Sequence, residues 1–137
     1  MKILIINGPN LNLLGKRNPE VYGTDSFESY LPSLERPNVQ LEYVQSNVEG
    51  ELINALHTTD ASAVIINAGG YTHTSVALRD AIEAITIPVI EVHISNISSR
   101  ESFRHESLIS PVAKGCIFGF GLAGYQLAID YVLNYLD

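Results

Sequence analysis

The sequence predicts an α/β fold in three layers, with a five-stranded parallel sheet covered by helices on both faces. Short runs rich in Val, Ile and Leu alternate along the chain with segments of helical periodicity. Alternation of this kind with short links is typical of parallel sheets. Several of the runs are almost continuously apolar, as expected for strands that are buried on both faces.

Five β-like runs are present, at residues 2–7, 40–46, 63–69, 88–95 and 115–121. Five strands in a chain of 137 residues suit the flavodoxin-like strand order 2-1-3-4-5. This order is expected because it is common in small doubly wound folds, and the sequence itself does not show it. We expect a single catalytic domain over residues 1–137, because no linker, repeat or low-complexity tract interrupts the pattern.

Helical segments are predicted between the strands. Residues 72–86 place apolar side chains on one helical face, and residues 122–136 carry a longer stripe. Residues 98–109 open with Ser98 and Glu101, which have the spacing of a capping box. Residues 24–35 fit a helix less well, because Pro32 must break it or end it early.

Composition excludes several classes of function. The formal net charge is −7 and no basic stripe relieves it, so we expect no binding to nucleic acid or to anionic membranes. No apolar run is long enough for a signal peptide or a bilayer span, and we expect a cytoplasmic protein. The only cysteine, Cys116, is predicted to be a small buried residue, and no Cys/His cluster suggests a metal.

Polar residues gather where the predicted strands end, which is where ligands bind in open parallel sheets. The segment NAGGYTHTS at 67–75 offers Asn67, His73 and several hydroxyls at a strand-to-helix turn. Such a turn presents free backbone N–H groups to an oxygen-rich ligand. The alternative is ordinary helix capping, but one hydroxyl would be enough for that.

The segment EVHISN at 91–96 places Glu91 and His93 two residues apart on a strand, so that both side chains leave the same face. A lone histidine is usually structural. A histidine beside a carboxylate at a strand's carboxyl end is a better candidate acid, because the negative charge favours imidazolium.

Two further motifs allow two interpretations each. Arg100 and Arg104 have the i, i+4 spacing of one helix face, and they either clamp an anion or pair with Glu101 on a solvated surface. GFGLAG at 119–124 matches the dinucleotide fingerprint, but no strand with an acidic residue follows it. Close packing of a helix on a strand explains these glycines better.

Together these motifs resemble those of the type II 3-dehydroquinate dehydratases, and the match covers almost the whole chain in order. The matching segments are NGPNLNLLGKRNPEVYG, QSNVEGEL, INAGGYTHTSVALRDA, VIEVHISN and SRESFRHESLISPVAKGCIFGFGLAGYQLA. Val48 and Ala68 stand where the family usually has His and Pro. The resemblance implies a hydro-lyase of the shikimate pathway that needs no metal or other cofactor, converting 3-dehydroquinate to 3-dehydroshikimate through an enolate.

The resemblance also implies the roles of individual residues. Tyr22 would be the base, with its pKa lowered by Arg17 in the same loop. His93, oriented by Glu91, would be the acid, and Asn10 would hold a water that stabilises the enolate. The substrate would be bound by the backbone at Ile94 and Ser95 and by the side chains of Asn67, His73, Arg104 and Asp80.

The position of Asp80 in the sequence suggests that several copies of the chain share active sites. If residues 73–80 lie on one helix, His73 and Asp80 are roughly 10 Å apart along its axis, too far for one small substrate. We therefore expect Asp80 to reach a neighbouring subunit's site, as in the family's trimers and dodecamers. Two other classes stay open on the residues alone: a non-catalytic receiver-like module and a small nucleotide- or flavin-dependent redox protein.

Overall fold

The five predicted strands form one parallel sheet in the order β2-β1-β3-β4-β5, which confirms the predicted fold class. The computed structural model describes residues 1–16, 20 and 26–136. The strands are β1 (Lys2–Asn7), β2 (Gln40–Gln45), β3 (Ala63–Asn67), β4 (Val89–His93) and β5 (Gly115–Phe118). Most of them end earlier than the sequence predicts.

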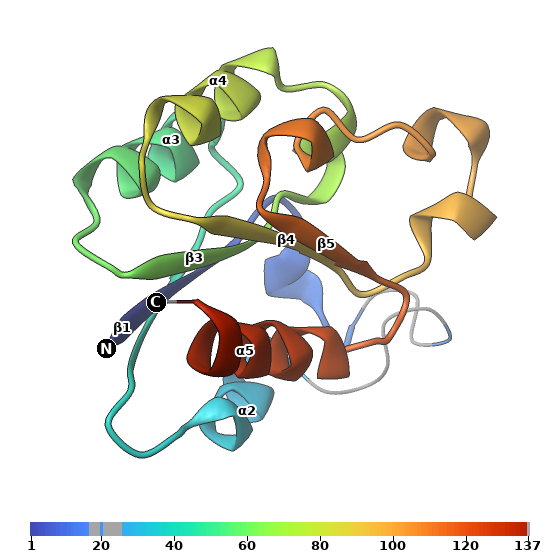
Figure 1. Ribbon diagram of the computed structural model, residues 1–137. Helices are drawn as coiled ribbons and strands as arrows, with labels where there is room; N and C mark the ends of the chain where they lie inside the picture. The colour runs from blue at the N-terminus through green and yellow to red at the C-terminus, as the bar shows by residue number, and fades with distance from the viewer. Residues whose placement is uncertain (17–19, 21–25, 137) are drawn as a thin grey trace.

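Helices cover both faces of the sheet, as Figure 1 shows. Helices α3 (Glu49–Thr58) and α4 (Val76–Ala84) lie on one face, and α2 (Phe27–Tyr30) and α5 (Ala123–Tyr135) lie on the other. The interior strand β1 alternates between two cores. Ile3 and Ile5 pack with Tyr125 of α5, whereas the side chains of Leu4 and Ile6 join the core beneath α3 and α4.

Local sequence explains where several helices begin and end. Helix α4 begins at Val76 rather than at residue 72, because Ser75 is its N-cap and accepts a hydrogen bond from the N–H of Leu78. Pro32 lies in the first turn of the 3₁₀ helix η2 (Leu31–Leu34), so α2 is short, as predicted. Helix α3 was not identified from the sequence, since its N-cap Val48 provides no capping side chain.

The predicted helix over residues 98–109 is wrong. This part of the chain forms separate 3₁₀ turns, η4 (Ile97–Ser99), η5 (Ser102–Arg104) and η6 (Ser110–Val112). The side chain of Asn96, not that of Ser98, caps the first turn, and Arg100 has an extended backbone that stops it. Hydrogen bonds made elsewhere replace helical ones: for example, the N–H of Leu108 donates to the carbonyl of Thr72.

The predicted burial of Cys116 is also wrong, since this residue is exposed. Strand β5 is at the edge of the sheet and its residues are only partly covered. The interpretation of GFGLAG as a packing motif is supported. A Cβ at Gly124 would lie 3.2 Å from the Val92 side chain, and Gly119 has a φ of 91° beside Asn96.

The core beneath α3 and α4 gives a stability prediction. Leu52 on α3 is fully buried, so Leu52→Ala is expected to cost about 2–5 kcal/mol of unfolding free energy, through lost burial and a residual cavity. Leu127 on α5 is 46% exposed, and Leu127→Ala is the matched control, with an expected cost within about 0.5 kcal/mol. Urea unfolding measures both, and equal costs would contradict this account of the core.

No helix in the described ranges is long and apolar enough to cross a membrane.

Candidate active site

A pocket opens where β1, β3 and β4 end, at the carboxyl edge of the sheet, as predicted. Its walls come from the segments that follow these three strands and from the 3₁₀ turns after β4. The lining residues are Pro9, Asn10, Leu11, Leu13, Leu14, Asn67, Gly69, Gly70, His73, His93, Ile94, Ser95, Ile97, Arg100 and Arg104.

The structure brings most of the predicted site residues together. The lining includes Asn10, Asn67, His73, His93, Ile94, Ser95 and Arg104, and Glu91 lies against His93. Asp80 is exposed on α4 and does not line this pocket. The predicted base Tyr22 and its partner Arg17 lie outside the described residues.

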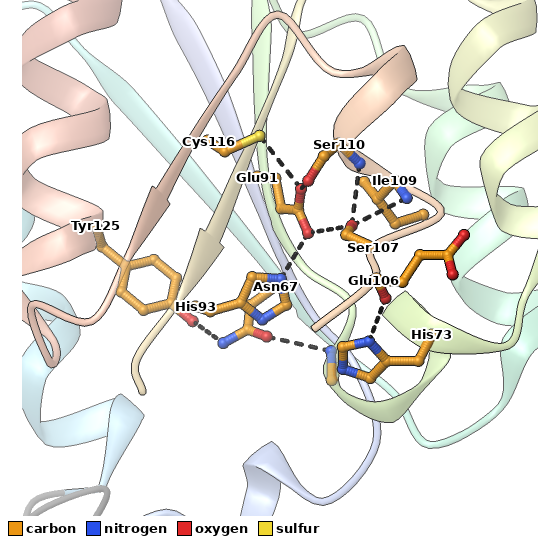
Figure 2. A network of polar contacts seen from close by, with 11 residues as sticks. Asn67, His73, Glu91, His93, Glu106, Ser107, Ile109, Ser110, Cys116 and Tyr125 are labelled. Atoms are coloured by element: carbon orange, nitrogen blue, oxygen red, sulfur yellow. Dashed lines mark hydrogen bonds and ion pairs between the residues drawn. The ribbon is translucent and has the colours of Figure 1, made fainter. Parts of the chain in front are cut away.

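His93 and Glu91 form a buried pair at the end of β4 (Figure 2), which confirms that both side chains leave the same face of the strand. His93 Nε2 lies 2.6 Å from Glu91 Oε2, and the two residues are 5% and 1% exposed. Burial alone would raise the pKa of Glu91, but hydrogen bonds and the charge of His93 outweigh it. The pKa of Glu91 is therefore below its usual range, and the carboxylate is charged.

Asn67 has a fixed side-chain orientation (Figure 2). Its Oδ1 accepts from the Gly69 N–H at 3.1 Å, and its Nδ2 donates to the Tyr125 hydroxyl at 3.1 Å. That hydroxyl in turn donates to Asn7 Oδ1 at 2.7 Å. A backbone N–H can only donate, so the amide oxygen must face Gly69. One N–H of Asn67 is then held by Tyr125 and a second is left for a ligand.

His73 lies in the 3₁₀ turn η3 (Gly69–His73), which corrects the idea that it shares one helix with Asp80. Its Nδ1 is 2.7 Å from the backbone carbonyl of Glu106. A carbonyl accepts only, so Nδ1 carries the proton and Nε2 is left for other contacts. The helical rise used for the distance between His73 and Asp80 therefore does not apply, although Asp80 does lie away from the pocket.

Arg100 and Arg104 both line the pocket, although they are not on one helix face as the sequence suggested. Arg104 Nε donates to Glu101 Oε2 at 2.9 Å, and Arg100 Nε lies 3.8 Å from Glu101 Oε1. The pairing with Glu101 is confirmed, and the binding of an anion by these arginines stays a prediction. The surface acid Glu101 orients two cations whose side chains border the pocket.

Asn10 has a left-handed backbone conformation, with a φ of 70°, directly after β1. Its N–H donates to Asn47 Oδ1 at 2.9 Å, and Asn47 Oδ1 also accepts from Gln45 Nε2 at 3.2 Å. Asn47 thus holds the turn that carries Asn10. Nothing in the motif QSNVEGEL had assigned this role to Asn47.

Sequence reasoning missed other residues of the site. It named Arg100 only as a possible anion clamp and favoured Arg104, it did not select the apolar wall formed by Leu11, Leu13 and Leu14, and it gave no role to Tyr125. The leucines are visible in the segment NLNLL, whereas Tyr125 is 58 residues from Asn67 in sequence and gave no signal. In the described parts of the chain, no three His, Cys, Asp or Glu side chains gather as a metal site.

The open parallel sheet and the buried histidine–glutamate pair beside a polar pocket define an α/β protein with a site suited to acid–base chemistry. A family model described as dehydroquinase class II matches residues 1–133. The chain belongs to this family of class II dehydroquinases.

Relatives and solved structures agree with this assignment. A 3-dehydroquinate dehydratase from a Shewanella species is 51% identical over 98% of this chain and 96% of its own length. One from an Exiguobacterium species is 53% identical, with the same coverage of both chains. The crystal structure of a type II dehydroquinase from Butyrivibrio crossotus has a TM-score of 0.90 at 44% identity, covering 98% of each chain.

Proposed function

We propose that this chain is a hydro-lyase that removes water from 3-dehydroquinate to give 3-dehydroshikimate, a step of the shikimate pathway. The relatives that are named 3-dehydroquinate dehydratases support the substrate. The observation that carries the proposal is the His93–Glu91 pair, because it supplies a proton donor at a pocket that also presents Asn67, His73 and Arg104.

The first step is removal of a proton from C2 of the substrate, next to the ketone. Tyr22 takes this proton onto its phenolate oxygen, and Arg17, five residues earlier in the sequence, favours the phenolate form. The electron pair moves onto the ketone oxygen, which becomes an enolate. Asn10 holds a water molecule that donates a hydrogen bond to this oxygen.

In the second step the enolate collapses, a C1–C2 double bond forms and the C1–O bond breaks. His93 gives its proton to the departing oxygen, which leaves as water. The negative charge of Glu91 stabilises imidazolium before this transfer. The backbone N–H groups of Ile94 and Ser95 hold the substrate carboxylate, and Asn67, His73 and Arg104 bind hydroxyl and carboxylate oxygens.

A direct assay tests the function. Purified protein with 3-dehydroquinate is expected to produce the ultraviolet absorbance of a conjugated enone, whereas heat-denatured protein is not. Absence of enone formation by folded protein over a wide range of substrate concentrations would reject the proposal.

We further propose that the single domain of residues 1–137 works as a cytoplasmic homo-oligomer built from trimers, up to a dodecamer. The position of Asp80 supports shared sites. Asp80 is exposed on α4 and outside its own pocket, while neighbouring Arg79 donates to the carbonyl of Leu108. A substrate contact by Asp80 therefore requires a second copy of the chain.

Mixing inactive variants tests the shared site. Tyr22→Phe chains and Asp80→Ala chains are each expected to be nearly inactive. When they are refolded together, activity is expected to return in part, because some sites receive Tyr22 from one chain and Asp80 from another. Full activity of Asp80→Ala alone, or no recovery in mixed oligomers verified by mass, would contradict shared sites.

A further inference from the structure

We propose that Ser110, assisted by Ser107, is a positioning residue of the active site that holds the Glu91 carboxylate in place for His93. This inference rests on the proposed function, since it concerns the residue that orients the acid. Neither serine lines the pocket, and the sequence motifs gave neither of them a role.

The carboxylate of Glu91 is surrounded by donors (Figure 2). Its Oε2 accepts from His93 Nε2 at 2.6 Å and from the Ser107 hydroxyl at 2.7 Å. Its Oε1 accepts from the Ser110 hydroxyl and lies 3.4 Å from the thiol of Cys116. Hydrogen bonds from His93, Ser107 and Ser110 to the two oxygens favour the charged form of the carboxylate over the protonated one.

The direction of the Ser107 bond is fixed by the backbone. Ser107 Oγ accepts from the N–H groups of Ile109 and Ser110, at 3.1 and 3.0 Å. Its own hydrogen is therefore directed to Glu91. Because Ser107 also shapes the turn at η6, its replacement would disturb the backbone. Ser110 is the cleaner probe, since its hydroxyl donates to Glu91 and no backbone contact of that hydroxyl is seen within the described ranges.

The two serines determine whether the Glu91 carboxylate can take a proton from His93. The titratable groups that face this carboxylate among the described residues are His93, on the same strand, and Cys116, on β5; the loop contributes only hydroxyls. Partial desolvation of the Cys116 side chain raises the pKa of its thiol, so the thiol stays neutral. With two hydroxyls stabilising its charge, the carboxylate does not take the proton from His93 Nε2. His93 Nε2 stays hydrogen-bonded to Glu91, and Nδ1 is the ring nitrogen of His93 that can face the substrate.

Three variants test the proposal. Ser110→Ala removes one donor to a charged group and is expected to lower kcat about tenfold, with KM changed less than about twofold. Loss of this donor raises the pKa of Glu91, so the Glu91 carboxyl is expected to titrate at higher pH by about one unit. Ser110→Thr keeps a hydroxyl and is expected to restore both values. Ser102→Ala, at an exposed serine of η5, is the matched control and leaves them unchanged.

A double-mutant cycle separates positioning from a general structural effect. In a Glu91→Gln background, which lacks the charge, Ser110→Ala is expected to change kcat less than about twofold. An equal loss of activity in both backgrounds would overturn the proposal.

A measurement without substrate tests the role of Ser110 independently of the proposed enzymatic function. In ¹³C spectra of the free protein, the carboxyl of Glu91 is expected to titrate below the ordinary range, and at higher pH in Ser110→Ala. If the chain proves inactive on 3-dehydroquinate, the function fails while this titration still decides the role of Ser110. Unchanged titration in Ser110→Ala would reject the positioning role.

Discussion

His93→Ala is expected to lower the rate of water elimination by about 10²–10⁴-fold, the usual contribution of a positioned general acid. The C1 hydroxyl is a poor leaving group unless it is protonated, and His93 is the buried histidine whose partner Glu91 stabilises its charged form. Proton removal at C2 does not require this acid, so the two steps should respond differently to the substitution.

Hydrogen exchange at C2 of the substrate in deuterated water, followed by NMR, measures the first step, and enone absorbance measures the overall reaction. In His93→Ala, exchange is expected to persist while product formation stops. His57→Ala is the matched control, because His57 is exposed on α3, away from the pocket, and its loss should change neither rate. If His93→Ala forms product at the unsubstituted rate, His93 has only a structural role.

The sheet was predictable because strands buried on both faces need continuous apolar runs. β1 and β3 carry such runs, and their polar ends, Asn7 and Asn67, are paired in the sheet. The pocket was predictable for a related reason: parallel strands bring their carboxyl ends to one edge. The pairing of Glu91 with His93 followed from the two-residue period of a strand and needed no tertiary information.

Predictions failed where long-range contacts override local preference. Ser98 and Glu101 have the spacing of a capping box, yet Asn96 caps the turn there and Glu101 bonds Arg104. Cys116 was misjudged because an apolar run does not reveal that its strand is at the edge of the sheet. The buried contact of Asn67 with Tyr125 spans 58 residues, a separation at which a single sequence gives no pairing signal.

The buried tyrosines bear on the identity of the base. Tyr125 bonds Asn67 of the pocket, but burial raises its pKa far above the ordinary value of a tyrosine. Burial also raises the pKa of Tyr43, which accepts from Asn7. Neither tyrosine can readily ionise near neutral pH. Tyr43 and Tyr125 are therefore poor candidates for a phenolate base, and we expect the base to be Tyr22, which follows Arg17 by five residues in the sequence.

Tyr22→Phe is accordingly expected to lower kcat by about 10³-fold or more, because both proton removal and all later steps depend on the base. Tyr125→Phe is the matched control: it removes a phenol that bonds Asn67 and Asn7 and does not act as the base, so KM is expected to rise several-fold while kcat falls less than about tenfold. Steady-state kinetics on 3-dehydroquinate, together with C2 exchange, measures both variants. The two variants can be compared directly because each substitution deletes one phenolic oxygen. If Tyr125→Phe lost exchange and Tyr22→Phe kept it, the base would be the buried tyrosine and the assignment of Tyr22 would be wrong.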